Sequence, residues 1–208
     1  MKIHIEIITG FLGAGKTTFI NSLLSESKVE GERICVFQLE EGEEKIIKKS
    51  DDNLKLKTKV VREMKELKEE MIFSIAEYKP HRIVIEYNGT WDLNELFSTL
   101  NEKIYRDSCK IKSVFFIADG KTLNEYMNNI GGFIIPFIQY SDIMLINNID
   151  YANKENLENG LKKLKNINPQ AYILEVSNKY ILKSVLREEK ILDNGYLRKM
   201  KIKHEKCK

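Results

Sequence analysis

The stretch Ile7-Ile8-Thr9-Gly10-Phe11-Leu12-Gly13-Ala14-Gly15-Lys16-Thr17-Thr18 decides the fold of this chain. It matches the pattern G-x-x-x-x-G-K-[ST] at every required place. A β-branched run from Ile3 to Ile8 precedes it, and apolar residues at helical spacing follow it from Phe19 to Leu24. A strand, a glycine-rich turn and a helix start form the context in which this pattern predicts a phosphate-binding loop.

The residue types of this loop suit a polyphosphate. Glycines let successive backbone N–H groups converge on one anion, and the helix adds about half a positive charge at its N-terminus. Lys16 supplies a cation for the β- and γ-phosphates, and the Thr17 hydroxyl is a hard oxygen ligand for Mg²⁺. The positions predicted to bind nucleotide here are Gly10, Gly13, Ala14, Gly15, Lys16, Thr17 and Thr18.

Length and composition limit what the rest of the chain can be. With 208 residues, 42% hydrophobic and 31% charged, it suits a single domain over residues 1–208 that buries about 70% of its unfolded surface. A net charge of +3 is too small to imply nucleic-acid binding, and no apolar run approaches the roughly 18 residues of a membrane span. Three dispersed cysteines and a start without signal-peptide features favour a reducing cytoplasm.

Apolar runs alternate with amphipathic stretches along the chain. This predicts an α/β fold of the P-loop NTPase class, a doubly wound, mainly parallel sheet with helices on both faces. The expected strands are Lys2–Ile8, Arg33–Leu39, Arg82–Tyr87, Lys112–Ala118, Ile143–Asn147 and Ala171–Val176. The expected helices are Thr17–Ser25, Arg62–Tyr78, Leu93–Thr99, Thr122–Met127, a segment within Phe133–Tyr140, Lys154–Lys165 and Lys179–Leu186.

Two segments fall outside this regular pattern. Glu40–Val61 opens with a run of acids and suits either a mobile switch loop, in which Glu40 orients a water molecule, or a solvated loop with helix-capping acids. The core is expected to end at about residue 186. The charged extension 187–208 has a basic end, which predicts a solvated or frayed terminus, with a binding tail as the alternative.

An apolar strand ends in an acid at Arg82-Ile-Val-Ile-Glu86-Tyr-Asn-Gly89. Ligands gather at the carboxyl ends of parallel strands, so Glu86 is expected to hold Mg²⁺ through water or to orient the attacking water. Gly89 could then present a backbone N–H to the γ-phosphate. The alternative is an ordinary strand end with a turn glycine. Asp119, at the end of the next strand, is expected to be a helix N-cap rather than a metal ligand.

The strand that begins at Asp142 ends in Asn147-Asn148-Ile149-Asp150. This arrangement is similar to the guanine-reading [NT]-K-x-D element, in which the aspartate accepts two hydrogen bonds that adenine cannot offer. Asn147 would support the loop and Asp150 would select the base. Asn148 stands where that element has lysine, and the lost lysine stem predicts weaker base binding rather than altered base choice. Asn and Asp also favour turns for local reasons, which is the alternative.

Together these motifs resemble the CobW/HypB/UreG family of P-loop GTPases, and the CobW branch in particular. The resemblance covers roughly Lys2 to Val176 and is most specific in the loop string from Gly10 to Thr18. Gln139-Tyr-Ser-Asp142 and Asn168-Pro169-x-Ala171 also match family elements. The branch usually carries Cys-x-Cys-Cys in the switch region and a further C-terminal domain; this chain has no cysteine between Cys35 and Cys109.

The resemblance implies a slow, Mg²⁺-dependent GTP hydrolase with GTP and Mg²⁺ as cofactors. Its catalytic residues would be Lys16, Glu86 and Glu40, and its metal ligands Thr17 and Glu86. It also implies a client metalloenzyme or corrinoid protein that the chain chaperones or activates, and it allows a nucleotide-dependent homodimer. Two alternatives stay open: a nucleotide-binding regulatory module that does not turn over, and a small-molecule kinase, for which the scattered arginines offer no lid.

Overall fold

A seven-stranded, entirely parallel sheet forms the centre of the described chain. The structure is a computed structural model, and it describes residues 2–39, 45–47, 55–87, 89–177, 182–188 and 195–206. The strand order is β3-β2-β4-β1-β5-β6-β7, so the expectation of a doubly wound, mainly parallel sheet is confirmed. The strands are β1 (Ile3–Gly10), β2 (Arg33–Gln38), β3 (Lys55–Val60), β4 (Arg82–Glu86), β5 (Cys109–Asp119), β6 (Ile143–Asn147) and β7 (Tyr172–Glu175).

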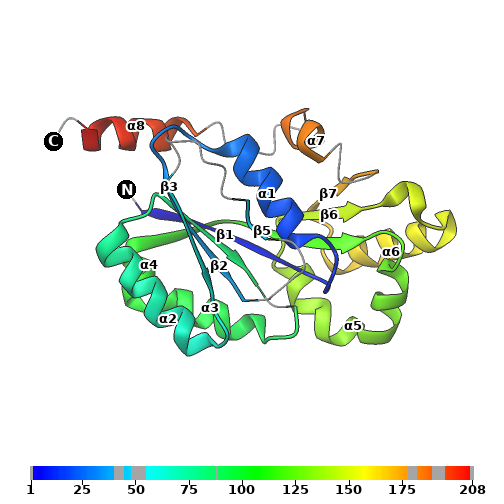
Figure 1. Ribbon diagram of the computed structural model, residues 1–208. Coiled ribbons are helices and arrows are strands. Elements are labelled where there is room, and N and C mark those ends of the chain that lie inside the picture. The colour runs from blue at the N-terminus through cyan, green and yellow to red at the C-terminus, as the bar shows by residue number, and fades with distance from the viewer. Residues whose placement is uncertain are drawn as a thin grey trace.

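Helices cover both faces of this sheet, as expected (Figure 1). Helices α1 (Lys16–Ser27), α7 (Leu182–Glu188) and α8 (Tyr196–Lys206) lie on the upper face in this view. On the lower face lie α2 (Met64–Phe73), α3 (Leu93–Asn101), α4 (Lys103–Ser108), α5 (Leu123–Gln139) and α6 (Lys154–Ile167). A π-helical turn, Ser74–Tyr78, extends α2, and a 3-10 turn, Ile149–Tyr151, follows β6.

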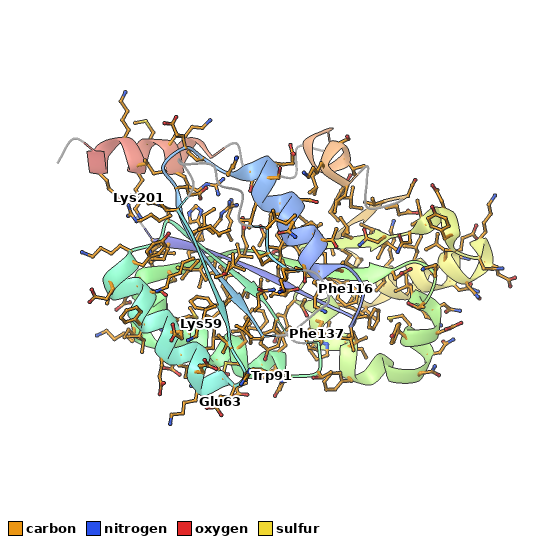
Figure 2. The ribbon with its side chains drawn as sticks, in the orientation of Figure 1. Lys59, Glu63, Trp91, Phe116, Phe137 and Lys201 are labelled. Atoms are coloured by element: carbon orange, nitrogen blue, oxygen red, sulfur yellow. The ribbon has the colours of Figure 1, made fainter. Side chains whose placement is uncertain are left out.

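The central strands are apolar because both of their faces are covered. Ile7, Ile8 and Ile85 are fully buried, and Figure 2 shows Phe116 and Phe137 in the interior. Burying one such side chain stabilises the fold by about 1.5–3 kcal/mol, so the central strands contribute much of the stability of the sheet.

The structure differs from the sequence-based expectation at four elements. Strand β3 was not predicted because its sequence, KLKTKV, is half lysine and forms an edge of the sheet. The short helix α4 was also missed. The two helices expected within 122–140 are the single helix α5, which continues through Pro136. The expectation of a frayed terminus is wrong for residues 196–206, which form helix α8, although several of its residues are exposed to solvent.

Helix α8 is fixed by a buried ion cluster at the amino ends of the strands. Arg198 is 2% exposed, and its Nη1 lies 3.1 Å from Oε1 of the fully buried Glu32. Nε of Arg82 lies 3.4 Å from the same Glu32 oxygen, and Arg198 Nη2 donates to the Ser27 carbonyl at 3.2 Å. Removing one partner of a buried ion pair costs about 3–5 kcal/mol, so this cluster holds the helix firmly.

A buried histidine, His81, lies beside this cluster. His81 Nδ1 accepts the Arg33 backbone N–H at 2.9 Å, so the ring proton sits on Nε2, which lies 3.0 Å from Glu205 Oε2. Burial lowers the pKa of His81 below its ordinary value of 6.5. Burial raises the pKa of Glu205, but hydrogen bonds from Arg33 and His81 outweigh it and lower that pKa overall. Lys201, on the same helix (Figure 2), also disfavours a charged His81.

We expect the free energy of unfolding to fall as the pH drops through 6.5. Below that pH the unfolded chain binds a proton at residue 81 that the folded chain does not, because the folded pKa is lower. Urea unfolding between about pH 8 and about pH 5 measures this slope. His81→Gln removes the titrating group and should flatten the slope over that range. An equal slope in wild type and variant would contradict this assignment.

Candidate functional site

The predicted phosphate-binding loop leaves the carboxyl end of β1 by a path that only glycine permits. Gly10 has φ +131°, and a Cβ on it would lie 2.0 Å from the Ile117 carbonyl oxygen of β5. Gly15, at the start of α1, has φ +94°. A Cβ on Gly13 would meet no described atom within 4 Å. The loop therefore has the glycine-dependent backbone geometry of an anion cradle.

Lys16 and Thr17 begin helix α1, where the helix dipole also favours an anion. Lys16 is 4% exposed, and its Nζ donates to the Phe11 carbonyl at 2.9 Å and to the Gly10 carbonyl at 3.3 Å. The ammonium group is thus folded back across the loop. A cation held at this place is well positioned to meet phosphate oxygens. Thr18, half-buried, follows on the same helical turn.

Glu86 joins three elements of the site, namely α1, β2 and β4. Thr17 Oγ1 donates to Glu86 Oε1 at 2.5 Å, and Gln38 Nε2 donates to Oε2 at 2.7 Å. The carboxylate is 2% exposed, so these bonds fix both of its oxygens. The structure therefore brings the two predicted metal ligands, Thr17 and Glu86, into direct contact. Their hard oxygens are the donor set that Mg²⁺ prefers, so the residues present fit that ion.

Gln38 was not singled out from the sequence, although a signal for it existed. It is the last residue of β2 and pairs in register with Glu86 of β4. A polar side chain that ends an apolar strand at the carboxyl edge of a parallel sheet is a candidate for this role.

Gly89, whose N–H is predicted to reach the γ-phosphate, lies against the phosphate-binding loop. A Cβ on Gly89 would come within 2.4 Å of the Gly10 carbonyl oxygen. Just before it, the Tyr87 N–H donates to the Ile8 carbonyl at 2.8 Å, which continues the pairing of β4 with β1. The chain following Glu86 is therefore pressed onto the loop, and a side chain at residue 89 would displace one of the two.

The end of β6 also reaches the loop. Asn147 is 8% exposed, and its Nδ2 donates to the Ala14 carbonyl at 3.0 Å. Its Oδ1 is buried and has no hydrogen-bond partner among the described residues. Asp150 follows three residues later and is exposed on the 3-10 turn. An amide that supports the loop and an exposed acid beyond it are the arrangement predicted for reading a purine base.

Asn148 adopts a left-handed backbone conformation, with φ 59°, and its Nδ2 donates to Asp119 Oδ2 at 2.9 Å. Asp119 Oδ1 accepts the Lys121 N–H at 2.9 Å. Asp119 thus forms the turn before α5, but the N-cap residue of that helix is Thr122, so the N-cap prediction is wrong in its detail. Asp119 also hydrogen-bonds Asn148, a role that was not predicted from the sequence.

The predicted catalytic residue Glu40 lies outside the described residues.

Comparison with known proteins shows the family of this chain. The nucleotide-binding domain of the CobW/HypB/UreG family matches residues 4–175. The chain belongs to this family. Its match spans the phosphate-binding loop, Glu86 and the Asn147–Asp150 turn, the elements that carry the candidate site.

Individual CobW/HypB/UreG relatives are distant. Zinc-regulated GTPase metalloprotein activator 1 of Dictyostelium discoideum is 21% identical, over 93% of this chain and 49% of the relative. The Zn(II)-bound YjiA GTPase from E. coli has a TM-score of 0.62 at 23% identity, over 83% of this chain and 57% of that one. The hydrogenase maturation factor HypB from Archaeoglobus fulgidus has a TM-score of 0.51 at 15% identity, over 90% of each chain. This chain spans about half the length of the first two.

The metal-binding cysteines usual in the CobW branch have no counterpart in this sequence. Among the described residues, no group of three or more His, Cys, Asp or Glu side chains gathers as a metal site. Cys35 and Cys109 are free and buried, and burial raises the pKa of each to about 11, so both are neutral thiols. No described helix is both long and apolar enough to span a membrane.

The contact between Gly89 and the loop predicts a sharp difference between two glycine substitutions. We expect Gly89→Ala to lower thermal stability and nucleotide affinity, because its Cβ would collide with the Gly10 carbonyl. Gly132→Ala, in α5 with open space around the Cβ, should raise stability by about 0.5–1 kcal/mol. Thermal unfolding with and without GTP measures both effects. Equal thermal stability and equal GTP-induced shifts in the two variants would show that the site tolerates a side chain at Gly89.

Proposed function

We propose that this chain is a Mg²⁺-dependent GTP-binding protein that hydrolyses GTP slowly. The observation that carries the proposal is the contact of Thr17 with Glu86 at the mouth of a phosphate-binding loop. Family membership supports it, because the matched domain is a nucleotide-binding domain. The turn that ends in Asp150 supports guanine as the base.

Each residue of the site would have a separate task in hydrolysis. Lys16 would exchange its carbonyl contacts for phosphate oxygens and offset the charge that develops on them. Thr17 and Glu86 would hold Mg²⁺, which would supply positive charge to offset the negative charge of the phosphate group. Gln38 fixes the second Glu86 oxygen, so the carboxylate can orient a water molecule only in a limited set of directions. Glu40 remains a second candidate for orienting that water.

We further propose that the protein chaperones or activates a metalloenzyme or corrinoid protein. A similar protein carries the name of a metalloprotein activator, and the family includes hydrogenase maturation factors. A chaperone or activator of this kind needs a stable resting state and a second state that a signal triggers. Purification of the chain from its native cell with GTP, and again without nucleotide, would identify a client by its nucleotide-dependent recovery.

Thermal unfolding with nucleotide tests the binding proposal directly. At about 100 times its dissociation constant, Mg²⁺–GTP should stabilise the fold by about 2.7 kcal/mol and raise the Tm by roughly 5–10 °C. ATP at the same concentration should give a smaller shift. Lys16→Ala should abolish the GTP shift, while Lys65→Ala, exposed on α2, should keep it. The absence of a shift with either nucleotide would exclude the proposal.

Phosphate release then separates turnover from binding alone. Release that disappears in Glu86→Gln would support hydrolysis. GTP binding without release, even with a client present, would instead assign the chain to the regulatory modules that bind nucleotide without turnover.

The kinase alternative is disfavoured because two of the scattered arginines, Arg82 and Arg198, are buried at the amino ends of the strands and could not serve in a lid.

Base selection is predicted to depend on Asp150. Asp150→Ala should weaken GTP binding strongly and leave ATP binding almost unchanged, because only guanine can donate two hydrogen bonds to this carboxylate. Sites built to bond such donors discriminate by large factors, so the GTP preference should fall by about tenfold or more. Glu155→Ala, a neighbouring exposed acid on α6, is the matched control. Competition binding with GTP and ATP measures the ratio; an unchanged ratio would place base selection elsewhere.

A further inference from the structure

A groove lies at the end of the molecule opposite to the phosphate-binding loop. It has a volume of about 710 Å³ and lies between α3, α4, the end of α5 and the first residues of β5. Lys2 lines it just before β1, whereas the loop follows the last residue of that strand. Eight residues of strand separate the two by about 25 Å. A ligand in the groove would therefore not touch a nucleotide.

The charge of the groove has one sign. Lys2, Arg106 and Lys110 line it, all three side chains are exposed, and none of the described lining residues is acidic. The backbone brings these residues together: β1 and β5 pair with Ile3 opposite Cys109, and Lys2 Nζ donates to the Arg106 carbonyl at 2.5 Å. Cations gathered on one surface attract acidic partners and steer their approach.

The remaining lining offers apolar and aromatic surface. The rings of Phe97 and Tyr140 have centroids 4.6 Å apart at 48°, and Tyr140 is 49% exposed. Cys109 is 5% exposed, and burial raises the pKa of its thiol to about 11, so the groove has a neutral wall there. Exposed aromatic side chains of this kind are typical anchors in protein interfaces.

We infer that this groove docks an acidic segment of a partner protein, with an aromatic side chain of that segment packed against Phe97 and Tyr140. Three cations around an aromatic surface match such a segment in both charge and polarity. A free phosphate compound fits less well, because the described lining includes no glycine-rich turn that would converge backbone N–H groups on it. The inference does not depend on the proposed GTPase activity, since the groove shares none of its named residues with the nucleotide site.

The test uses the whole chain and a fluorescent peptide of alternating glutamate and phenylalanine, with anisotropy as the readout. We expect saturable binding that weakens as salt is raised. The variant K2E/R106E/K110E should lose about tenfold or more in affinity, and Tyr140→Ala should lose affinity without a change in salt dependence. The control K65E/K154E/K203E changes the net charge equally on exposed lysines elsewhere and should bind nearly as wild type does.

Further measurements distinguish docking of an acidic aromatic segment from a general attraction between the cations and any anion. Saturating Mg²⁺–GTP should leave the peptide affinity unchanged. Circular dichroism and cooperative thermal unfolding like those of the wild type would show that the groove variant is folded. The neutral variant R106Q/K110Q provides a milder second test. The inference is overturned by any of three results: no saturable binding, equal loss in the control variant, or equal displacement by inorganic triphosphate or a single-stranded oligonucleotide.

Discussion

The close approach of three backbone segments around Gly10 is the constraint on which the rest of the structure depends. A Cβ at Gly10 would lie 2.0 Å from the Ile117 carbonyl, and one at Gly89 would lie 2.4 Å from the Gly10 carbonyl. Strands β1, β4 and β5 can therefore carry their chain ends to one place only if these positions lack side chains. In the loop that follows, a Cβ on Gly13 would meet no described atom within 4 Å. Close packing of backbone is what makes an anion site possible beside an apolar sheet.

The same constraint explains why the acid of the site is held so firmly. Because β4 pairs with β1, Glu86 faces the start of α1. Its carboxylate accepts hydrogen bonds from Thr17 and Gln38. A buried carboxylate is costly unless its oxygens are hydrogen-bonded, and here both are. The bonds are exchangeable, because a hydroxyl and an amide can each turn to another oxygen ligand. The carboxylate is thus fully hydrogen-bonded by groups that another ligand could replace.

Much of the fold, and the positions of several site residues, could be predicted from the sequence, for physical reasons that differ between elements. The phosphate-binding loop was predictable because its chemistry needs fixed residue types at fixed spacing, and Glu86 was predictable because parallel strands end at one edge. Strand β3 was not, because an edge strand with alternating lysines shows little of the apolar signal that marks central strands. Helix α8 was missed because its basic sequence conceals one buried arginine, Arg198, whose partner Glu32 is 166 residues away. Long-range pairing of this kind leaves no local pattern.

The two ends of the sheet differ in the groups that contact their buried cations. At the amino ends, Arg82 pairs with Glu6 and Glu32, and Arg198 pairs with Glu32. Two guanidinium groups thus meet two carboxylates, and this attaches α8 to the sheet. At the carboxyl ends, the Lys16 ammonium group instead contacts the carbonyl oxygens of Gly10 and Phe11. Replacing a carbonyl by a phosphate oxygen strengthens the bond to an ammonium group, whereas replacing a matched carboxylate gains little. A phosphate oxygen would therefore strengthen the contacts of Lys16 more than those of the two arginines, which already face carboxylates.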